Sequence, residues 1–384
     1  MASPNPARHV LFSLFALLLV LVLLEGAGGW LLSRQPALAA TRELLLGERL
    51  PETDVNATPQ AYLLYIPTPG FTSHGFQQNN SQGYRGPAIP VQRTPGGFRV
   101  LFLGGSTTYG EGVHDPAASY PARLGELLQA DPALAGRQVE ILNAGLRWGT
   151  TAEILIHYLL KFRYYRPDLV VINPGGNDPV AYTTPAYQPD YSHWRKPPRM
   201  IEPLPHQSRW LLRSRLASLL VVLLFYPDVA AGTTFVHGSE QTPARWFTPR
   251  QSGRLQLDEQ AFYNNLSTVV REIRRDGAQV LLLSYQGNPF DVADQEAWRR
   301  YYDHEERVLQ QVAAEQGVLF APFPLARMPE ALWVDPSHLG AAGEQAKAQY
   351  VHEQLQPLLP ALLSAQPPSA PPAPAGLELV LPGQ

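Results

Sequence analysis

The string VLFLGGSTT at residues 100–108 constrains the fold more than any other part of the chain. An apolar run that stops abruptly at two glycines and a serine is typical of a buried strand ending in a tight turn. Ligands and catalytic groups of open α/β sheets gather at the edge where such strands end. Ser106 is therefore a candidate nucleophile, if a base, an orienting acid and oxyanion donors lie nearby. A serine after a turn also commonly caps a helix, so the string alone leaves its role open.

From Phe98 onward, short apolar segments alternate with amphipathic ones. The expected strands lie at 99–103, 139–142, 169–172, 280–284 and 318–321. The expected helices between them lie at 117–129, 151–165, 258–275 and 291–315. Apolar strands that alternate with helices predict a mainly parallel, five-stranded sheet with helices on both faces, a three-layer α/β/α fold.

The chain divides by composition into four parts. Residues 1–33 are a membrane anchor or signal, 34–97 a connector rich in Pro, Gly, Asn and Gln, 98–364 the α/β domain, and 365–384 a Pro-rich tail. An insertion at 179–257, rich in Tyr, Trp and Pro, follows the third strand and is a natural lid or substrate-binding element. Its apolar run 216–225 fits a packed helix or a surface for membrane or acyl chains.

The N-terminal segment is long enough to cross a bilayer. Residues 10–24 are apolar apart from Ser13, Glu25 interrupts, and 26–32 continue apolar. A span needs about 20 residues, and a carboxylate near its end costs far less than one at its centre. We expect an uncleaved anchor. A signal peptide cleaved near Ala37-Leu38-Ala39, or a core helix of a soluble protein, are the alternatives.

The flanking charges say little about orientation. Arg8 precedes the apolar segment, and Arg34, Arg42 and Arg49 follow it. This excess of positive charge after the segment alone favours the α/β domain on the cytoplasmic side. A short leader before a large domain favours the opposite. We therefore expect the domain outside the cytoplasm, in the periplasm or at the cell surface.

Composition narrows the classes of function. The net charge is −3 without a basic stripe, which argues against nucleic acid as a partner. The chain has no cysteine, so disulfides and thiolate metal sites are excluded. The histidines show no metal-ligand spacing, and we expect neither a metal nor another cofactor.

Further polar side chains follow other predicted strands. Asn177 ends the third strand within GGND, where its amide can donate to an oxyanion or simply form a turn. Asp335 and His338 lie three residues apart before the last helix, a spacing at which a carboxylate can orient an imidazole base. The plain alternative makes Asp335 a helix cap. Together with Ser106, these residues point to one edge of the sheet.

At these residues the chain resembles the SGNH hydrolase superfamily, also called GDSL esterases and lipases. The matching blocks are Gly104-Gly105-Ser106, Asn143-Ala144-Gly145, Gly175-Gly176-Asn177-Asp178 and Asp335-Pro336-Ser337-His338. The resemblance implies a flavodoxin-like sheet, with Ser106 as nucleophile, His338 as base and Asp335 orienting it. It also implies that the Ser106 N–H, a glycine N–H of the second block and the Asn177 amide hold the oxyanion.

Two departures from this pattern affect the site. The usual Gly-Asp-Ser of the first block is Gly-Gly-Ser here. An ungapped match of the second block places Trp148 where the oxyanion glycine normally sits. A shift of one residue restores Gly149 to that role, and Gly145 is a third option.

The sequence therefore predicts a serine ester hydrolase, an esterase, lipase or carbohydrate deacetylase, that works through an acyl-enzyme. Its partner is an ester-bearing glycan, lipid or small molecule, and the N-terminal helix attaches it to a membrane. One alternative is a polysaccharide O-acyltransferase, because similar membrane-tethered SGNH-like domains act in polysaccharide acetylation. The other is a catalytically silent glycan-binding domain.

Overall fold

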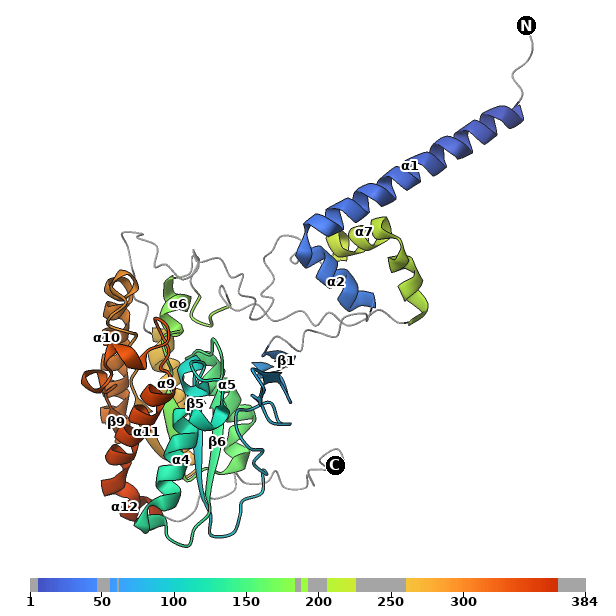
Figure 1. Ribbon diagram of the computed structural model, residues 1–384. Helices are drawn as coiled ribbons and strands as arrows, with labels where there is room; N and C mark the ends of the chain where they lie inside the picture. Colours follow the sequence, from blue (N-terminus) through green and yellow to red (C-terminus); the bar gives the residue numbers. More distant parts are fainter. Residues whose placement is uncertain are drawn as a thin grey trace. The chain divides into compact units, whose positions relative to one another are not determined.

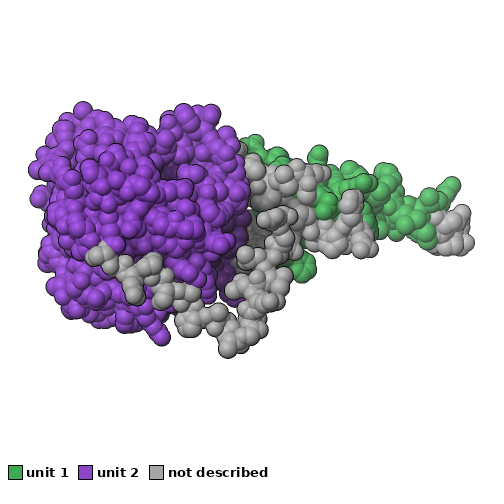
Figure 2. Space-filling model, turned by 90° about the horizontal axis from the view of Figure 1, so that it is seen from below, with its two compact units in different colours: residues 1–53, 196–237 green, residues 54–195, 238–384 purple. Residues whose placement is uncertain are grey.

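The computed structural model describes residues 6–46, 56–60, 62–183, 188–192, 206–225 and 260–364. The chain forms two compact units, coloured separately in Figure 2. Unit 1 comprises residues 1–53 and 196–237, and unit 2 comprises 54–195 and 238–384. The predicted tail and much of the predicted insertion lie outside the described residues.

Unit 2 is built on a five-stranded parallel sheet with the order β6-β5-β7-β8-β9. Its strands are β5 (Phe98–Gly104), β6 (Val139–Gly145), β7 (Leu169–Asn173), β8 (Gln279–Leu283) and β9 (Leu319–Ala321). In chain order this arrangement is 2-1-3-4-5, the order of flavodoxin-like sheets. The predicted fold class is confirmed, and the sheet is parallel throughout. The order reverses between β5 and β7, so a ligand is expected outside the carboxyl ends of these two strands.

Helices cover both faces of the sheet (Figure 1). Alternate residues of β5 point to opposite faces. Phe98, Val100 and Phe102 pack with residues of α4 (Tyr120–Ala130) and α11 (Ala341–Leu355). Leu101 and Leu103 join a second core with α5 (Thr151–Leu160), α9 (Gln260–Arg275) and α10 (Val292–Gln316). Because β5 is buried along its whole length, it holds its carboxyl end in a fixed position.

Unit 2 also contains shorter strands and short α-helices. They are β1 (Thr58–Gln60), β2 (Leu64–Ile66), β3 (Thr72–Ser73), β4 (Phe76–Gln77), α3 (Ser106–Tyr109), α6 (Asp178–Thr183) and α12 (Leu359–Ser364). The β strands of this group form two antiparallel pairs within the segment predicted as a connector.

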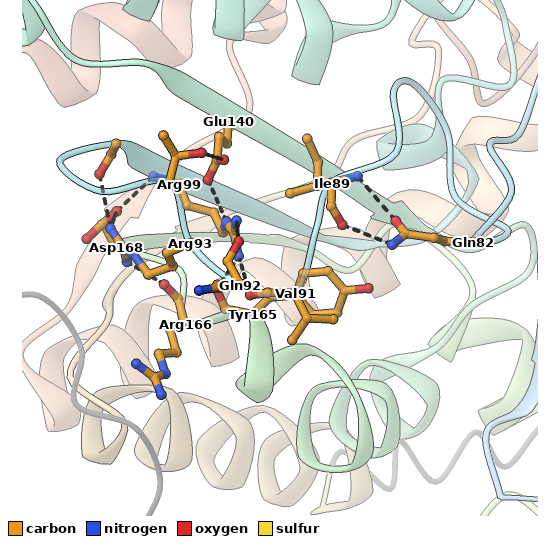
Figure 3. A network of polar contacts seen from close by, with 12 residues as sticks. Gln82, Ile89, Val91, Gln92, Arg93, Arg99, Glu140, Tyr165, Arg166 and Asp168 are labelled. Atoms are coloured by element: carbon orange, nitrogen blue, oxygen red, sulfur yellow. Dashed lines mark hydrogen bonds and ion pairs between the residues drawn. The ribbon is translucent and has the colours of Figure 1, made fainter. Parts of the chain in front are cut away.

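A polar network fixes that connector to the start of β5 (Figure 3). Arg99 is fully buried, and its guanidinium donates to the Glu140 carboxylate at 2.8 Å and to the Tyr165 carbonyl at 2.6 Å. It also donates to the Val91 carbonyl of the connector at 3.1 Å. A buried charge of this kind is tolerated only when it is paired and hydrogen-bonded, as Arg99 is.

Unit 1 consists of helices from two distant segments. They are α1 (Pro6–Arg34), α2 (Pro36–Leu46), the 3-10 helix η4 (His206–Arg213) and α7 (Arg215–Phe225). Their shared core comprises Leu32, Leu38, Leu45, Leu46, Leu212, Leu219 and Val222. Within the described part of the chain, one helix, at Arg8–Arg34, is long and apolar enough to cross a membrane.

Helix α2 falls where the sequence suggested only a connector. Pro36 begins it, a position that proline favours, and the following residues are mostly good helix formers. Leu38 and Leu45 are buried in the unit 1 core, so tertiary packing stabilises this short helix.

Candidate active site

Ser106 lies at the carboxyl edge of the sheet, as the sequence predicts. β5 ends at Gly104, Gly105 caps the next element, and Ser106 is the first residue of α3. The N–H groups at the start of a helix have no intrahelical partner. The hydroxyl of Ser106 lies 2.8 Å from Nε2 of His338, which is 232 residues later in the chain.

The local packing explains the glycine before Ser106. A Cβ atom at Gly105 would lie 2.7 Å from the Asn177 amide nitrogen and 2.9 Å from the Pro174 carbonyl oxygen. Both distances are shorter than ordinary carbon contacts. In this structure the loop after β7 therefore approaches position 105 too closely for a side chain, and this is the position where the Gly-Asp-Ser pattern has aspartate.

Asp335 and His338 meet in the loop before α11. His338 Nδ1 lies 2.8 Å from Asp335 Oδ2, while Asp335 Oδ1 accepts from the backbone N–H groups of Ser337 at 2.7 Å and His338 at 2.8 Å. We assign the tautomer from these partners: Nδ1–H donates to the carboxylate, so Nε2 accepts from the Ser106 hydroxyl. The His338 side chain is 16% exposed, which leaves the imidazole reachable.

The surroundings of Asp335 keep its carboxylate ionised. Burial alone would raise the pKa, but the hydrogen bond and charge of His338 and the two backbone N–H groups outweigh it, and the pKa is lowered. An ionised carboxylate holds the imidazole ring in place and stabilises an imidazolium.

The second block, Asn143-Ala144-Gly145, ends β6, and the loop from there to α5 contains Trp148 and Gly149. The N–H of Gly145 donates to Asn143 Oδ1 at 3.0 Å, and the N–H of Gly149 donates to the Leu146 carbonyl at 2.9 Å. An oxyanion would have to displace one of these bonds in order to use either predicted glycine. Gly145 also has a packing role, because a Cβ there would lie 2.1 Å from the backbone nitrogen of Tyr109 in α3.

Trp148 adopts an unusual backbone conformation within this loop. Its φ is 62°, in the left-handed region that favours glycine. This is the position that the ungapped match pairs with the oxyanion glycine, so the backbone there has a glycine-like conformation although the residue is tryptophan.

Asn177 lies beside the nucleophile. Its side-chain amide donates to the Gly149 carbonyl at 2.9 Å, so the loops after β6 and β7 are joined there. The amide has two N–H groups, and this contact uses one of them.

Asp178 belongs to the third block, and the sequence analysis assigned it no role. In the structure it holds the segment after β7 in place. Its buried carboxylate accepts from the Thr151 hydroxyl at 2.6 Å and the Tyr191 hydroxyl at 2.8 Å. Burial raises the pKa of Asp178 to about 7, despite these hydrogen bonds. Its position directly after Asn177 was the only signal in the sequence.

The sequence analysis also missed two contacts of Arg147 in the second-block loop. The Tyr65 hydroxyl donates to the Arg147 carbonyl at 2.6 Å, and the Arg147 guanidinium pairs with Glu111 at 2.7 Å. Neither contact has a local pattern, because each joins segments that are far apart in the chain.

The fold and the site together define a serine hydrolase of the flavodoxin-like type. The chain matches the GDSL-like lipase/acylhydrolase family over residues 102–346, well over half its length. It therefore belongs to that family and is a serine esterase or acylhydrolase that acts on ester bonds. No curated protein sequence matches it.

Several solved structures are similar to the chain. A mutant of Axe2, an acetyl-xylooligosaccharide esterase from Geobacillus stearothermophilus, has 18% identity and a TM-score of 0.40, covering 68% of this chain and 96% of that one. TesA has 20% identity and a TM-score of 0.40, covering 68% and 99%. LAE5, an alpha/beta hydrolase enzyme from the metagenome of Lake Arreo in Spain, has 17% identity and a TM-score of 0.40, covering 68% and 95%.

Proposed function

We propose that this protein hydrolyses esters through an acyl-enzyme on Ser106. The observation that carries the proposal is the unbroken line of hydrogen bonds from the Ser106 hydroxyl through the His338 ring to the Asp335 carboxylate, each 2.8 Å long. Nucleophile, base and orienting acid in this order are the arrangement that serine hydrolases share across unrelated folds.

Ser106, His338 and Asp335 have distinct roles in this mechanism. His338 Nε2 takes the hydroxyl proton as Ser106 Oγ attacks the ester carbonyl, and then gives that proton to the departing alcohol. A water molecule next loses a proton to the same nitrogen and attacks the acyl-enzyme, which releases the acid and restores Ser106. The Asp335 carboxylate stabilises the imidazolium in both steps.

The oxyanion needs donors placed before the reaction starts. Among the contacts of the described residues, none uses the Ser106 N–H at the start of α3 or the second N–H of the Asn177 amide, so these two are the donors proposed here. A third donor from the β6–α5 loop, at Gly145, Trp148 or Gly149, would follow from a small rearrangement of that loop.

We also propose that α1 is retained as a membrane anchor with unit 2 outside the cytoplasm. Leu32 of α1 packs in the same core as Leu38, which lies in the middle of the alternative cleavage sequence 37–39. Cleavage there would remove part of a folded core. The ester substrate is then a glycan, lipid or small molecule met at the membrane surface.

The test is the turnover of p-nitrophenyl acetate by the full chain in detergent. Ser106→Ala should lower kcat by about 10³-fold or more, because the acyl-enzyme cannot form. Ser73→Ala, which changes a partly exposed serine in β3 outside the site, is the control and should keep the wild-type rate. Equal turnover by Ser106→Ala and wild type would refute the nucleophile. Acyl transfer to an added oligosaccharide in place of hydrolysis would identify an acyltransferase instead.

A further inference from the structure

Helix α7 is apolar on all sides although much of it is exposed. After Arg215, Ser218 is its only polar residue. Leu219 and Val222 face the core of unit 1, while the opposite side exposes Leu220, Leu223, Leu224 and Phe225, the last two by 70% and 67%. A helix that is apolar all round belongs in a protein core or in a membrane.

Glu25 of α1 joins this helix to the start of α7. Its carboxylate accepts from the Ser214 hydroxyl at 2.7 Å, from the Arg215 N–H at 2.6 Å and from the Leu216 N–H at 3.1 Å. These donors form the start of α7, where N–H groups lack intrahelical partners and the helix dipole favours a negative charge. A carboxylate and a helix N-terminus, each costly in lipid when alone, therefore satisfy one another.

Small residues let the two helices approach closely (Figure 1). A Cβ atom at Gly28 would lie 3.1 Å from the Leu216 backbone, and one at Gly29 would lie 2.8 Å from the Arg215 side chain. Glycine at a helix–helix contact is the arrangement that allows close packing of helices in membranes.

The turn before α7 also satisfies its polar groups internally. Arg42 of α2 donates to the Ser218 hydroxyl at 3.1 Å and to the Leu212 carbonyl at 3.0 Å, and the Ser218 hydroxyl donates to the same carbonyl at 2.8 Å. Irregular backbone is tolerated at membrane depth only when its polar groups have such partners.

We propose that α7 is a second membrane-embedded element, docked on α1 through Glu25 and covered by lipid acyl chains on its exposed face. Residues 10–24 of α1 are also apolar and predominantly exposed, so a lipid environment suits both helices. The exposed Trp30 and Trp210 belong to the same unit, and tryptophan favours the membrane–water interface.

Helix α7 lies in a segment of the chain that is inserted within the catalytic unit. The segment that carries α7 is residues 196–237, and it is inserted into the chain of unit 2 between α6 and α9. The chain is thus attached to the membrane before the catalytic unit and again from within it.

Single-cysteine labelling tests the proposal on the full chain, which contains no natural cysteine. Leu224→Cys reports on α7, Leu17→Cys on α1, and Leu160→Cys on an exposed leucine of α5 in unit 2. Each variant is labelled with the fluorophore NBD and reconstituted in phosphatidylcholine vesicles. NBD at 224 and at 17 should show blue-shifted emission that spin-labelled lipids quench and iodide does not, whereas NBD at 160 should be quenched by iodide.

Two results would overturn the lipid-facing assignment. Quenching of the 224 label by iodide, as at 160, would place α7 in water. Protection of the 224 label from both quenchers would mean that protein, such as a second copy of the chain, covers this face.

Glu25→Leu tests the docking contact itself. Loss of the carboxylate in this variant should remove lipid quenching of the label at 224. The label at 17 should be unchanged, because α1 still spans the bilayer. Glu25→Gln keeps an oxygen acceptor and should retain part of the quenching at 224. Unchanged lipid quenching at 224 in Glu25→Leu would show that Glu25 does not position α7.

Discussion

At the scale of single residues, two local roles coexist at the same positions. Ser106 both begins α3 and faces the imidazole, and Asp335 both accepts backbone N–H groups and orients His338. The helix-cap alternatives raised by the sequence are wrong, because Gly105 caps α3 and Gly340 caps α11. Local patterns identified these residues, and only the long-range distances show that they meet.

The proposed mechanism predicts that Ser106 and His338 act as one unit. His338→Ala should lower kcat about as much as Ser106→Ala, and the double variant should lose little more. The measurement is kcat with p-nitrophenyl acetate for all three. Losses that multiply in the double variant would contradict a shared role.

Asp335→Asn isolates the orienting role. The asparagine amide would donate to His338 Nδ1, so the ring would carry its proton on Nε2 and could not accept one from Ser106. We expect a loss of kcat on the order of 10⁴-fold. Urea unfolding should change little, since the side-chain oxygen can still accept the backbone N–H groups. A near-native rate would show that Asp335 does not set the tautomer.

At the scale of elements, the strands were predictable to within a few residues. β5, β7 and β8 are apolar runs bounded by turns, and burial on both faces of a parallel sheet requires that composition. Helix α2 was not predictable, because contacts with α7 much later in the chain bury its leucines. The roles of Gly145 and Trp148 were equally hidden, since each depends on the backbone path of the loop.

The docking of the connector on α5 leads to a prediction about pH. His157 is buried, and its Nε2 lies 2.9 Å from the Leu63 carbonyl. Burial lowers the pKa of His157 to about 4 from 6.5. Between these values the unfolded chain binds the proton that the folded chain excludes, so the free energy of unfolding falls as pH falls from 6.5 toward 4. The contribution of this one group is about 3 kcal/mol.

His157→Gln keeps an amide donor for Leu63 and does not titrate. Urea unfolding at neutral pH and near pH 4 should therefore show a smaller acid loss of stability than wild type. His74→Gln, at an exposed histidine, controls for the removal of one histidine. The same acid loss in His157→Gln and wild type would contradict this role of His157.

At the scale of the whole molecule, the parallel sheet brings distant blocks to one edge. This is why a serine after the first strand and a histidine 232 residues later could be joined by argument from the sequence. Unit 1 could not be foreseen in this way. Glu25 looked like a tolerated interruption of an apolar helix, and its partner Arg215 lies 190 residues away. No periodic pattern or fold rule connects the two segments.

The most direct test of the account is to trap the acyl-enzyme and locate it. The full chain is mixed with excess p-nitrophenyl acetate, quenched in acid and mapped by peptide mass spectrometry. The account predicts one added acetyl group, on Ser106, that is absent in Ser106→Ala. Turnover with no adduct on Ser106, or with the acetyl group on another residue, would contradict the claim that Ser106 is the nucleophile.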